Sequence, residues 1–335
     1  MSSFADSPRL PIIDLSLFDV GGTWRDHVAA QVDWAAGEFG FFYIVGHGIE
    51  SGVIDSLLTS SRTFFRQSAE EKHRIHMSRG GRAWRGYFPV GGELTSGRPD
   101  LKEGLYFGEE LEEDDERVRA GKPLHGRNVF PELPGFREAV LDYMSALTGL
   151  GHRLMTSIGR GLRLGDNYFV DRYTGSPTTL FRIFNYPSAR AADARGVGEH
   201  TDYGLLTLLY QDEVGGLQVK HRSGWIDVPY VPGSFVVNVG DMLERLTSGR
   251  YTSALHRVIN ASGRSRISMP FFFDPRFEAE LRPIAGVAPE AVRPELIDRW
   301  DGIDLRDVRG TYGDYLVGKV SKVFPELGRS SLRGR

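Results

Sequence analysis

The sequence predicts a mainly β fold, made of two packed sheets of short strands with helices on their flanks. Three patterns support this prediction. Between about residues 178 and 275, short apolar segments alternate with turn signals that contain Gly or Pro, as in a β-sandwich or barrel. In the N-terminal half, apolar residues recur at helical spacing along longer segments. After about residue 290 the helical pattern returns.

The N-terminal half is expected to combine helices with a few short strands. Pro11 stands at the start of an apolar strand, where a missing N–H is tolerated. Residues 68–71 have the pattern of a helix capping box. In chain order we expect a strand at 10–15, a helix at 24–37, a strand at 41–45, a helix at 51–65, extended segments and turns at 80–108, a solvated acidic loop at 110–116 and a long helix at 135–162.

The central region is expected to be extended almost throughout. Its segments are separated by turn signals such as Gly215-Gly216, Ser223-Gly224 and Pro232-Gly233. Jelly rolls built in this way can hold a metal in the barrel mouth. The strands are expected at 180–186, 205–210, 217–220, 225–228, 235–239, 256–260 and 266–273.

The chain has no internal repeat, low-complexity tract or convincing linker, so we expect one domain over residues 1–335. A helix-rich N-terminal part should cover about 1–165, followed by a jelly-roll core at about 178–275 and C-terminal helices at about 290–327.

The composition is that of an ordinary globular protein with a sizeable core, since 40% of the residues are hydrophobic and 25% are charged. A net charge of −3 gives no reason to expect nucleic acid or an anionic membrane as a partner. Cysteine is absent, which excludes disulfides, thiolate metal sites and cysteine nucleophiles. The first nine residues lack the apolar region of a secretion signal, so we expect a soluble, cytoplasmic protein.

Two histidines and one aspartate form the ligand set expected for non-haem Fe(II). His200 and Asp202 are two residues apart, which places both side chains on the same face of an extended strand. His256 begins a later strand and would supply the third ligand. Such a facial triad leaves coordination positions open for a substrate and O₂. The sequence therefore predicts an iron-dependent oxygenase.

The other histidines are interpreted as surface or packing residues, because only His200 and His256 stand at the edges of predicted strands in one β-domain, with an Arg-x-Ser at a fixed offset behind them. Asp241 is a rival carboxylate, but it follows a strand end and is better explained as a structural cap. The histidines set aside are His27, His47, His73, His76, His125, His152 and His221.

Arg266 and Ser268 lie on one face of the strand that follows His256. The planar guanidinium of arginine binds a carboxylate through two hydrogen bonds, and the serine hydroxyl adds another donor. An arginine among Ile267, Met269 and Phe271 would be costly to bury without an anion. We therefore expect the pair to bind a ligand carboxylate, while the alternative is an ion pair with one of the chain's own acids.

Ordered sequence blocks recur along nearly the whole chain in the pattern of one enzyme family. They are LPIID at 10–14, GFFYIVGHG at 40–48, EHTDYG at 199–204, GLQV at 216–219, NVGD at 238–241, YTSALHRV at 251–258, RIS at 266–268 and TYGDYL at 311–316. These blocks resemble the isopenicillin N synthase-like branch of the Fe(II)/2-oxoglutarate-dependent dioxygenases.

The resemblance implies a distorted double-stranded β-helix, a cupin-like jelly roll flanked by helices. It implies that the two histidines and the aspartate bind Fe(II), and that Arg266, Ser268 and Tyr186 hold the distal carboxylate of the cosubstrate 2-oxoglutarate (2OG). The implied reaction uses O₂ to hydroxylate, desaturate or cyclise a small organic substrate, while 2OG is decarboxylated to succinate and CO₂.

One position departs from the family pattern. The family often shows Arg-x-Asn-x-Tyr-Pro, whereas residues 182–187 of this chain read Arg-Ile-Phe-Asn-Tyr-Pro. By strand alternation Phe184 shares a face with Arg182 and Tyr186. A phenyl ring therefore replaces the polar group expected beside the cosubstrate.

Two other functions fit the same residues. An isopenicillin N synthase-type Fe(II) oxidase would use the Arg-x-Ser pair for the substrate's own carboxylate and would need no oxo-acid. A non-catalytic, metal-stabilised β-domain that binds a ligand belongs to another class, but such a domain would have little use for open metal positions.

The substrate cavity is expected to be partly polar and partly aromatic, and to accept a small organic acid, an amino-acid derivative or a secondary metabolite. The residues that occupy substrate-lining segments in this branch, or share a strand face with the cosubstrate site, are Arg85, Tyr87, Tyr106, Phe107, Phe184, Phe272 and Phe273.

Overall fold

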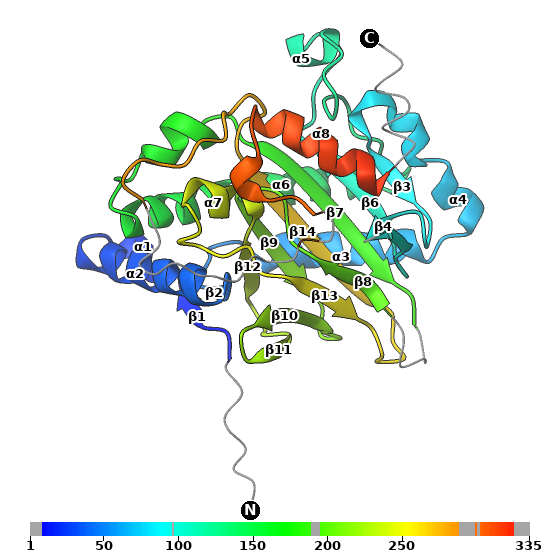
Figure 1. The fold of residues 1–335 in the computed structure, drawn as a ribbon. Helices are drawn as coiled ribbons and strands as arrows, with labels where there is room; N and C mark the ends of the chain where they lie inside the picture. Colours follow the sequence, from blue (N-terminus) through cyan, green and yellow to red (C-terminus); the bar gives the residue numbers. More distant parts are fainter. Residues whose placement is uncertain (1–8, 96, 189–194, 288–298, 300–301, 325–335) are drawn as a thin grey trace, which may run out of the picture.

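The computed structural model describes residues 9–95, 97–188, 195–287, 299 and 302–324, and its centre is a pair of facing β-sheets (Figure 1). The larger sheet has eight strands in the spatial order β1 (Ile12–Asp14), β2 (Phe41–Val45), β12 (Phe235–Val239), β9 (Leu206–Gln211), β14 (Arg266–Asp274), β7 (Thr178–Tyr186), β6 (Glu103–Gly108) and β3 (Gly86–Phe88). The smaller sheet has four strands in the order β11 (Gly224–Val228), β10 (Leu217–His221), β13 (His256–Ile259) and β8 (Arg195–His200). A short hairpin is formed by β4 (Leu94–Thr95) and β5 (Arg98–Pro99). The predicted jelly-roll core is confirmed.

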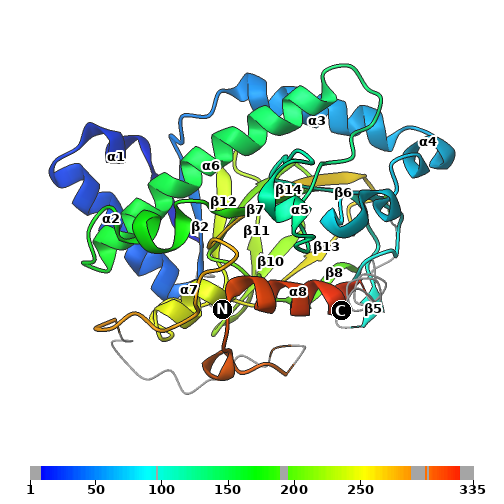
Figure 2. The ribbon, with the colours of Figure 1, turned by 90° about the horizontal axis from the view of Figure 1, so that it is seen from above.

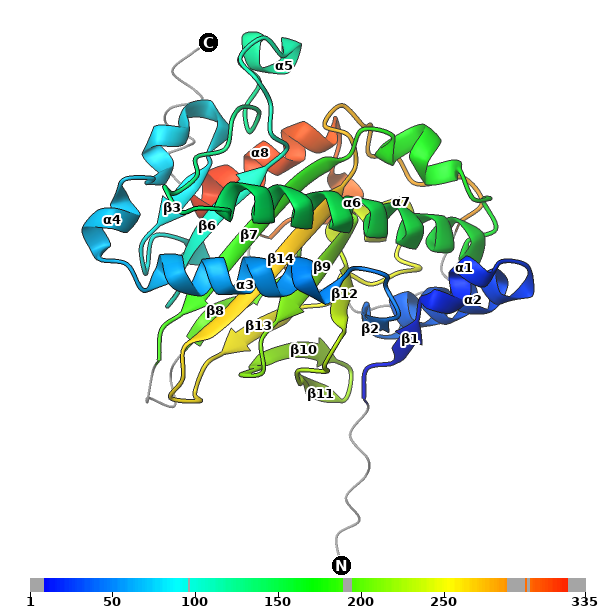
Figure 3. The same ribbon diagram turned by 180° about the vertical axis from the view of Figure 1, so that it is seen from behind.

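Helices cover the outer face of the larger sheet, where α3 and α6 run across its strands (Figure 3). The C-terminal helix α8 lies on the opposite side of that sheet (Figure 2). The helices are α1 (Ser16–Val20), α2 (Thr23–Glu38), α3 (Ser51–Phe65), α4 (Ala69–His73), α5 (Glu116–Arg119), α6 (Phe136–Gly161), α7 (Asp241–Leu246) and α8 (Tyr312–Val323), with η1 (Met77–Ala83), η2 (Val170–Thr174) and η3 (Leu305–Asp307).

The long helix α6 forms because its apolar residues recur on one face. Leu147, Leu150, Leu154 and Ile158 are all buried against the larger sheet and the neighbouring helices. Gly151 belongs to the same face, and a β-carbon there would lie 2.4 Å from the ring of Phe273. Glycine therefore lets the helix approach β14 closely. None of the helices in the described residues is long and apolar enough to cross a membrane.

Strand alternation in the larger sheet separates the cavity side from the helix side. On β14, Arg266, Ser268 and Phe272 face the space between the two sheets. Phe273 points the other way and packs edge-on against His152 of α6. The neighbouring strand β7 pairs in antiparallel register, with Tyr186 opposite Arg266. The register therefore puts the predicted carboxylate-binding side chains of two strands on the same wall.

The structure corrects several predicted elements. Strand β8, which runs from Arg195 to His200, was not among the predicted strands. Helix α7 starts at Asp241, where only a structural cap was expected. The predicted C-terminal helix begins only at Tyr312, because Thr311 and Asp314 form its capping box. Between residues 302 and 311 there is a single 3₁₀ turn. The remainder of that prediction, at 290–298, 300–301 and 325–327, lies outside the described residues.

Helix α8 is attached to the larger sheet through a buried carboxyl group. The Tyr312 hydroxyl donates to Asp274 at the end of β14, over 2.5 Å, and the backbone N–H of Leu205 donates to the same carboxyl group. A β-carbon at position 204 would collide with this carboxyl group, which explains the glycine there. Burial raises the pKa of Asp274 to about 7.

We expect Asp274 to make the free energy of unfolding fall as the pH rises from about 4 to about 7. The unfolded chain releases this proton near the ordinary pKa of 3.8, whereas the folded chain keeps it until about pH 7. The fall contributed by one such group is at most about 1.4 kcal/mol per pH unit. Urea unfolding at several pH values should show this slope in the native protein and a shallower one in Asp274→Asn. Equal slopes in the two proteins would contradict the assignment.

Candidate metal and cosubstrate site

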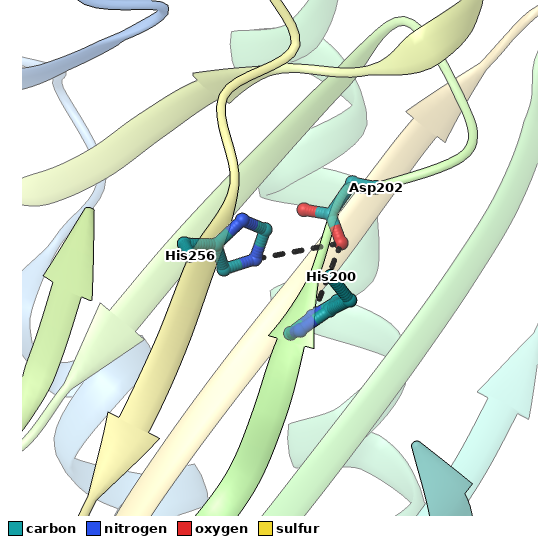
Figure 4. A group of neighbouring side chains, drawn as sticks. All are labelled: His200, Asp202 and His256. Carbon is teal, nitrogen blue, oxygen red and sulfur yellow. Dashed lines mark ion pairs between the residues drawn. The ribbon is translucent and has the colours of Figure 1, made fainter. Parts of the chain in front are cut away.

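The three predicted metal ligands lie together between the two sheets. The Nε2 atoms of His200 and His256 are 3.9 and 3.8 Å from the same oxygen, Oδ1 of Asp202 (Figure 4). The donor atoms of all three side chains lie within 4.8 Å of one another, and among the described residues this is the one such group. His200 and His256 come from adjacent strands, β8 and β13, and are paired in register.

Backbone carbonyl groups fix the orientation of both imidazole rings. Nδ1 of His200 lies 2.8 Å from the carbonyl oxygen of Gly198, and Nδ1 of His256 lies 3.1 Å from that of Ala254. A proton on each Nδ1 satisfies these carbonyls and leaves the Nε2 lone pairs directed at the shared oxygen of Asp202. This is the tautomer that a metal ligand requires.

Two side chains that the sequence interpretation did not assign to the site hold the Asp202 carboxylate. The hydroxyl of Thr207 and the amide nitrogen of Asn238 both donate to Oδ2, at 2.5 and 2.8 Å. Oδ1 is therefore left for a metal, because the protein already satisfies the other oxygen. Asn238 lies between Val237 and Val239 in a buried strand, and a polar residue in such an apolar segment was the available signal.

Electrostatics at this group also favour metal binding. Burial, together with the neighbouring His256, lowers the pKa of His200 to about 3, so its ring is neutral at neutral pH. Burial alone would raise the pKa of Asp202, but the two imidazoles and the two hydrogen-bond donors outweigh this effect and keep the carboxyl group ionised. Two imidazole nitrogens and one carboxylate oxygen fit Fe(II).

Arg266 is completely buried at the same cavity and has unused hydrogen-bonding capacity. Its Nε donates to the carbonyl oxygen of Gly215, and its Nη2 donates to the amide oxygen of Gln211 at 3.2 Å. Its Nη1 has no hydrogen-bond partner among the described residues, and no described acid lies within ion-pair distance of the guanidinium. A buried arginine that has no acid in direct contact and a free N–H donor fits the carboxylate of a ligand.

The other predicted cosubstrate residues lie on the same wall. Ser268 faces the cavity two residues from Arg266, and the Tyr186 ring lies 4.7 Å from the guanidinium carbon of that arginine. Phe184 also lines the cavity, between Arg182 and Tyr186 on β7. The Nζ atom of Lys102 lies 4.8 Å from the Phe184 ring. The ammonium group of Lys102 is therefore close to position 184, where the family pattern has the amide of an asparagine.

The cavity that holds these groups has a volume of about 90 Å³ and is bounded by both sheets and by helix α8. Alternate residues of β7 and β14 form one wall, strands β8, β10 and β13 form the other, and the segment around β4 closes one end. Tyr312, Leu316 and Val323 of α8 complete the lining.

Of the predicted substrate-pocket residues, Phe184 and Phe272 line this cavity, and the hydroxyl of Tyr106 donates to Glu93, which also lines it. The other four do not line it. Phe107 and Phe273 alternate with their neighbours and pack on the helix side of the sheet. Tyr87 packs against α3 and donates to Glu103. Arg85 is buried elsewhere, where it donates to the carbonyl oxygen of Leu124.

Two facing sheets hold a group of ligands of the kind that binds iron, next to a buried arginine whose Nη1 has no hydrogen-bond partner among the described residues. Together these features define a non-haem oxygenase. Comparison with known protein families identifies it further. The family model of the 2OG-Fe(II) oxygenase superfamily matches residues 173–275, and a model described as the N-terminal region of non-haem dioxygenases in morphine synthesis matches residues 10–133. The chain belongs to the 2OG-Fe(II) oxygenase superfamily and is an Fe(II)- and 2OG-dependent oxidoreductase.

Individual relatives are similar over nearly their whole length. A probable iron/ascorbate oxidoreductase of Dictyostelium discoideum is 45% identical, over 97% of this chain and 97% of its own. A homoarginine-6-hydroxylase of Arabidopsis thaliana is 35% identical, over 95% of this chain and 98% of its own. The crystal structure of a full-length Neurospora crassa protein in complex with alpha-KG and thymine superposes with a TM-score of 0.79 at 26% identity, covering 95% of this chain and 98% of that one.

We expect replacement of Asn238 by Ala to weaken metal binding about 10- to 100-fold, because Asp202 loses a donor that orients it. Titration of the apoprotein with Fe(II) under anaerobic conditions measures the affinity. Gln218→Ala, which removes an exposed hydrogen bond to Asp227 on the smaller sheet, should leave the affinity unchanged. An affinity in Asn238→Ala within twofold of the native value would contradict this role.

Proposed function

We propose that the chain oxidises a C–H bond of a small polar molecule, with hydroxylation as the main outcome. In this proposal His200, Asp202 and His256 bind Fe(II), while Arg266 and Ser268, assisted by the ring of Tyr186, hold 2OG. The relatives support a small polar substrate that contains nitrogen, because one is named for homoarginine and one structure contains thymine.

The observation that carries the proposal is the buried Arg266. Its guanidinium is inaccessible to water, has an unpaired nitrogen and faces the cavity that also contains the ligand group. A charge buried in this way is costly unless an anion accompanies it. The distal carboxylate of 2OG is such an anion, and a bidentate contact with arginine would also fix the direction in which the molecule lies.

The residues of the chain contribute mainly binding and orientation. When bound, Fe(II) and 2OG supply the oxidising power, and 2OG is converted to succinate and CO₂. Gln211 orients Arg266, because the amide nitrogen of Gln211 donates to the carbonyl oxygen of Val228 and its amide oxygen accepts from the guanidinium. Leu209, Leu217 and Val258 line the cavity and exclude water from it.

A second candidate is an Fe(II) oxidase that needs no 2OG. Two observations favour it: Phe184 replaces the amide of the family pattern, and a 35% identical relative from Dictyostelium mucoroides is named an oxidase, 1-aminocyclopropane-1-carboxylate oxidase. In that case Arg266 and Ser268 would hold a carboxylate of the substrate itself. The two candidates differ in whether O₂ consumption requires 2OG.

We expect O₂ uptake and succinate formation to require both Fe(II) and 2OG. Arg266→Gln should raise the KM for 2OG about 10- to 100-fold, because a hydrogen bond to a charged group contributes about 1.5–3 kcal/mol. Ser268→Ala should raise it roughly 2- to 10-fold, and it tests the site even if the arginine variant fails to fold. An oxygen electrode and quantitation of succinate provide the measurements. Substrate-driven O₂ uptake at the native rate without 2OG would support the oxidase instead.

The control for the metal assignment is Asp202→Ala. This variant should keep its circular-dichroism spectrum, because Thr207 and Asn238, which donate to the aspartate, lie in strands that are paired through their backbones. It should lose iron-dependent turnover. Retained turnover would show that the metal binds elsewhere.

A further inference from the structure

A second arginine faces the cavity and is separate from the proposed carboxylate anchor. Arg182 and Tyr186 lie on the same side of β7, four residues apart, which corresponds to roughly 13 Å along a strand. Tyr186 is paired with Arg266. Arg182 instead stacks on Phe272, which is paired with Thr207. The hydroxyl of Thr207 donates to Asp202, so Arg182 lies toward the metal group.

Arg182 is held by stacking and keeps most of its hydrogen-bond donors. Its guanidinium carbon lies 4.2 Å from the ring of Tyr106 and 4.9 Å from that of Phe272. Its Nη1 donates to Oε1 of Glu93 at 3.3 Å, and this is the single hydrogen bond of its side chain within the described residues. A guanidinium has five N–H donors, so several remain for a ligand in the cavity.

Glu93 is the acidic partner of Arg182 and also lines the cavity. Its carboxylate is buried and accepts a hydrogen bond from Tyr106 at 2.5 Å. Lys102 Nζ lies 2.8 Å from its other oxygen, but that oxygen has no well-directed hydrogen bond. Lys102 also contacts Asp100, which in turn accepts from Thr95. The charged groups thus form one connected network at the end of the cavity.

Stability alone does not explain this network. Two acids and one cation, Glu93, Asp100 and Lys102, are buried in it, and the side chain of the second cation, Arg182, is 14% exposed. Buried ion pairs are often no more stabilising than apolar residues of the same size. Because the two signs balance, a ligand with a net charge would leave an uncompensated charge in a poorly solvated space. The network therefore favours a ligand without net charge, and a zwitterion can in addition pair each of its two charged groups with a group of opposite sign in the network.

We propose that Arg182 and Glu93 form the head-group site for a free α-amino acid, with the substrate carboxylate on Arg182 and its ammonium group on Glu93. The two groups of an α-amino acid are joined through a single carbon, which suits a guanidinium and a carboxylate that are 3.3 Å apart. The side chain of the amino acid then extends toward His200, Asp202 and His256. This inference rests on the proposed function, since it places the oxidised C–H bond at that metal.

Binding to the anaerobic complex of the protein with Fe(II) and 2OG tests the proposal first. Isothermal titration with the proteinogenic L-α-amino acids and L-homoarginine identifies the tightest binder. Its desamino acid and its decarboxylated amine are then titrated in the same way. Each analogue should bind at least about 10-fold more weakly, because each lacks one of the two charged groups that pair with Arg182 and Glu93 in this proposal.

Two variants should change this selectivity in opposite ways. Glu93→Gln should bind the amino acid about 10- to 100-fold more weakly while binding the desamino acid as the native protein does. Arg182→Gln should lose a similar factor for the amino acid and keep its affinity for the amine. If Arg182 and Glu93 had a purely structural role, each substitution would lower the affinity for the amino acid and for both analogues together. A variant that binds the amino acid more weakly but keeps its affinity for one analogue is therefore specific to head-group recognition.

Glu103→Gln is the matched control. Glu103 is also a buried carboxylate that pairs with a lysine and a tyrosine, Lys72 and Tyr87, but it does not line the cavity. This variant should show a comparable loss of thermal stability to Glu93→Gln and unchanged selectivity.

The proposal is overturned if no amino acid binds, if thymine or a desamino acid binds as tightly as the best amino acid, or if Glu103→Gln alters selectivity as much as Glu93→Gln. The proposed function is tested separately by titrating 2OG into the same proteins. Loss of 2OG binding in Glu93→Gln and Arg182→Gln, with amino-acid affinity retained, would refute the head-group assignment but not the oxygenase. Failure of the native protein to bind 2OG would refute the proposed function.

Discussion

The arrangement of the site depends on how the protein divides the two oxygens of one buried carboxylate. Thr207 and Asn238, from two neighbouring strands of the larger sheet, satisfy Oδ2 of Asp202. Oδ1 is then directed at the histidine nitrogens, which belong to the smaller sheet. His200, Asp202 and His256 therefore come together only when the two sheets face each other in the correct register. The metal site thus depends on the jelly-roll fold.

The positions of the two arginines along the cavity follow from the two-residue periodicity of the strands. On β7 and β14, every second residue faces the cavity, which gives one cationic position near Ser268 and another near Phe272. Each cation has aromatic neighbours that fix it without neutralising it. A cosubstrate and a substrate, both bearing carboxylates, can thus be held at separate places in one cavity.

Much of this could be predicted from the sequence, because the motifs that carry the chemistry lie at strand ends with regular spacing. The three metal residues and the Arg-x-Ser pair follow from spacing and residue type. The substrate residues were predicted less well, because adjacent residues such as Phe272 and Phe273 were considered together although a strand sends them to opposite faces. Glu93 and Lys102 could not have been found in this way, since tertiary packing alone brings their irregular segment to the cavity.

The most direct test is a crystal structure of the protein with Fe(II) and 2OG, obtained without O₂. The account predicts one ion bound by Nε2 of each histidine and by Oδ1 of Asp202, with the distal carboxylate of 2OG on Arg266 and Ser268. Arg182 should remain free of the cosubstrate. An ion bound away from these three atoms, or 2OG bound through Arg182, would contradict the central claim.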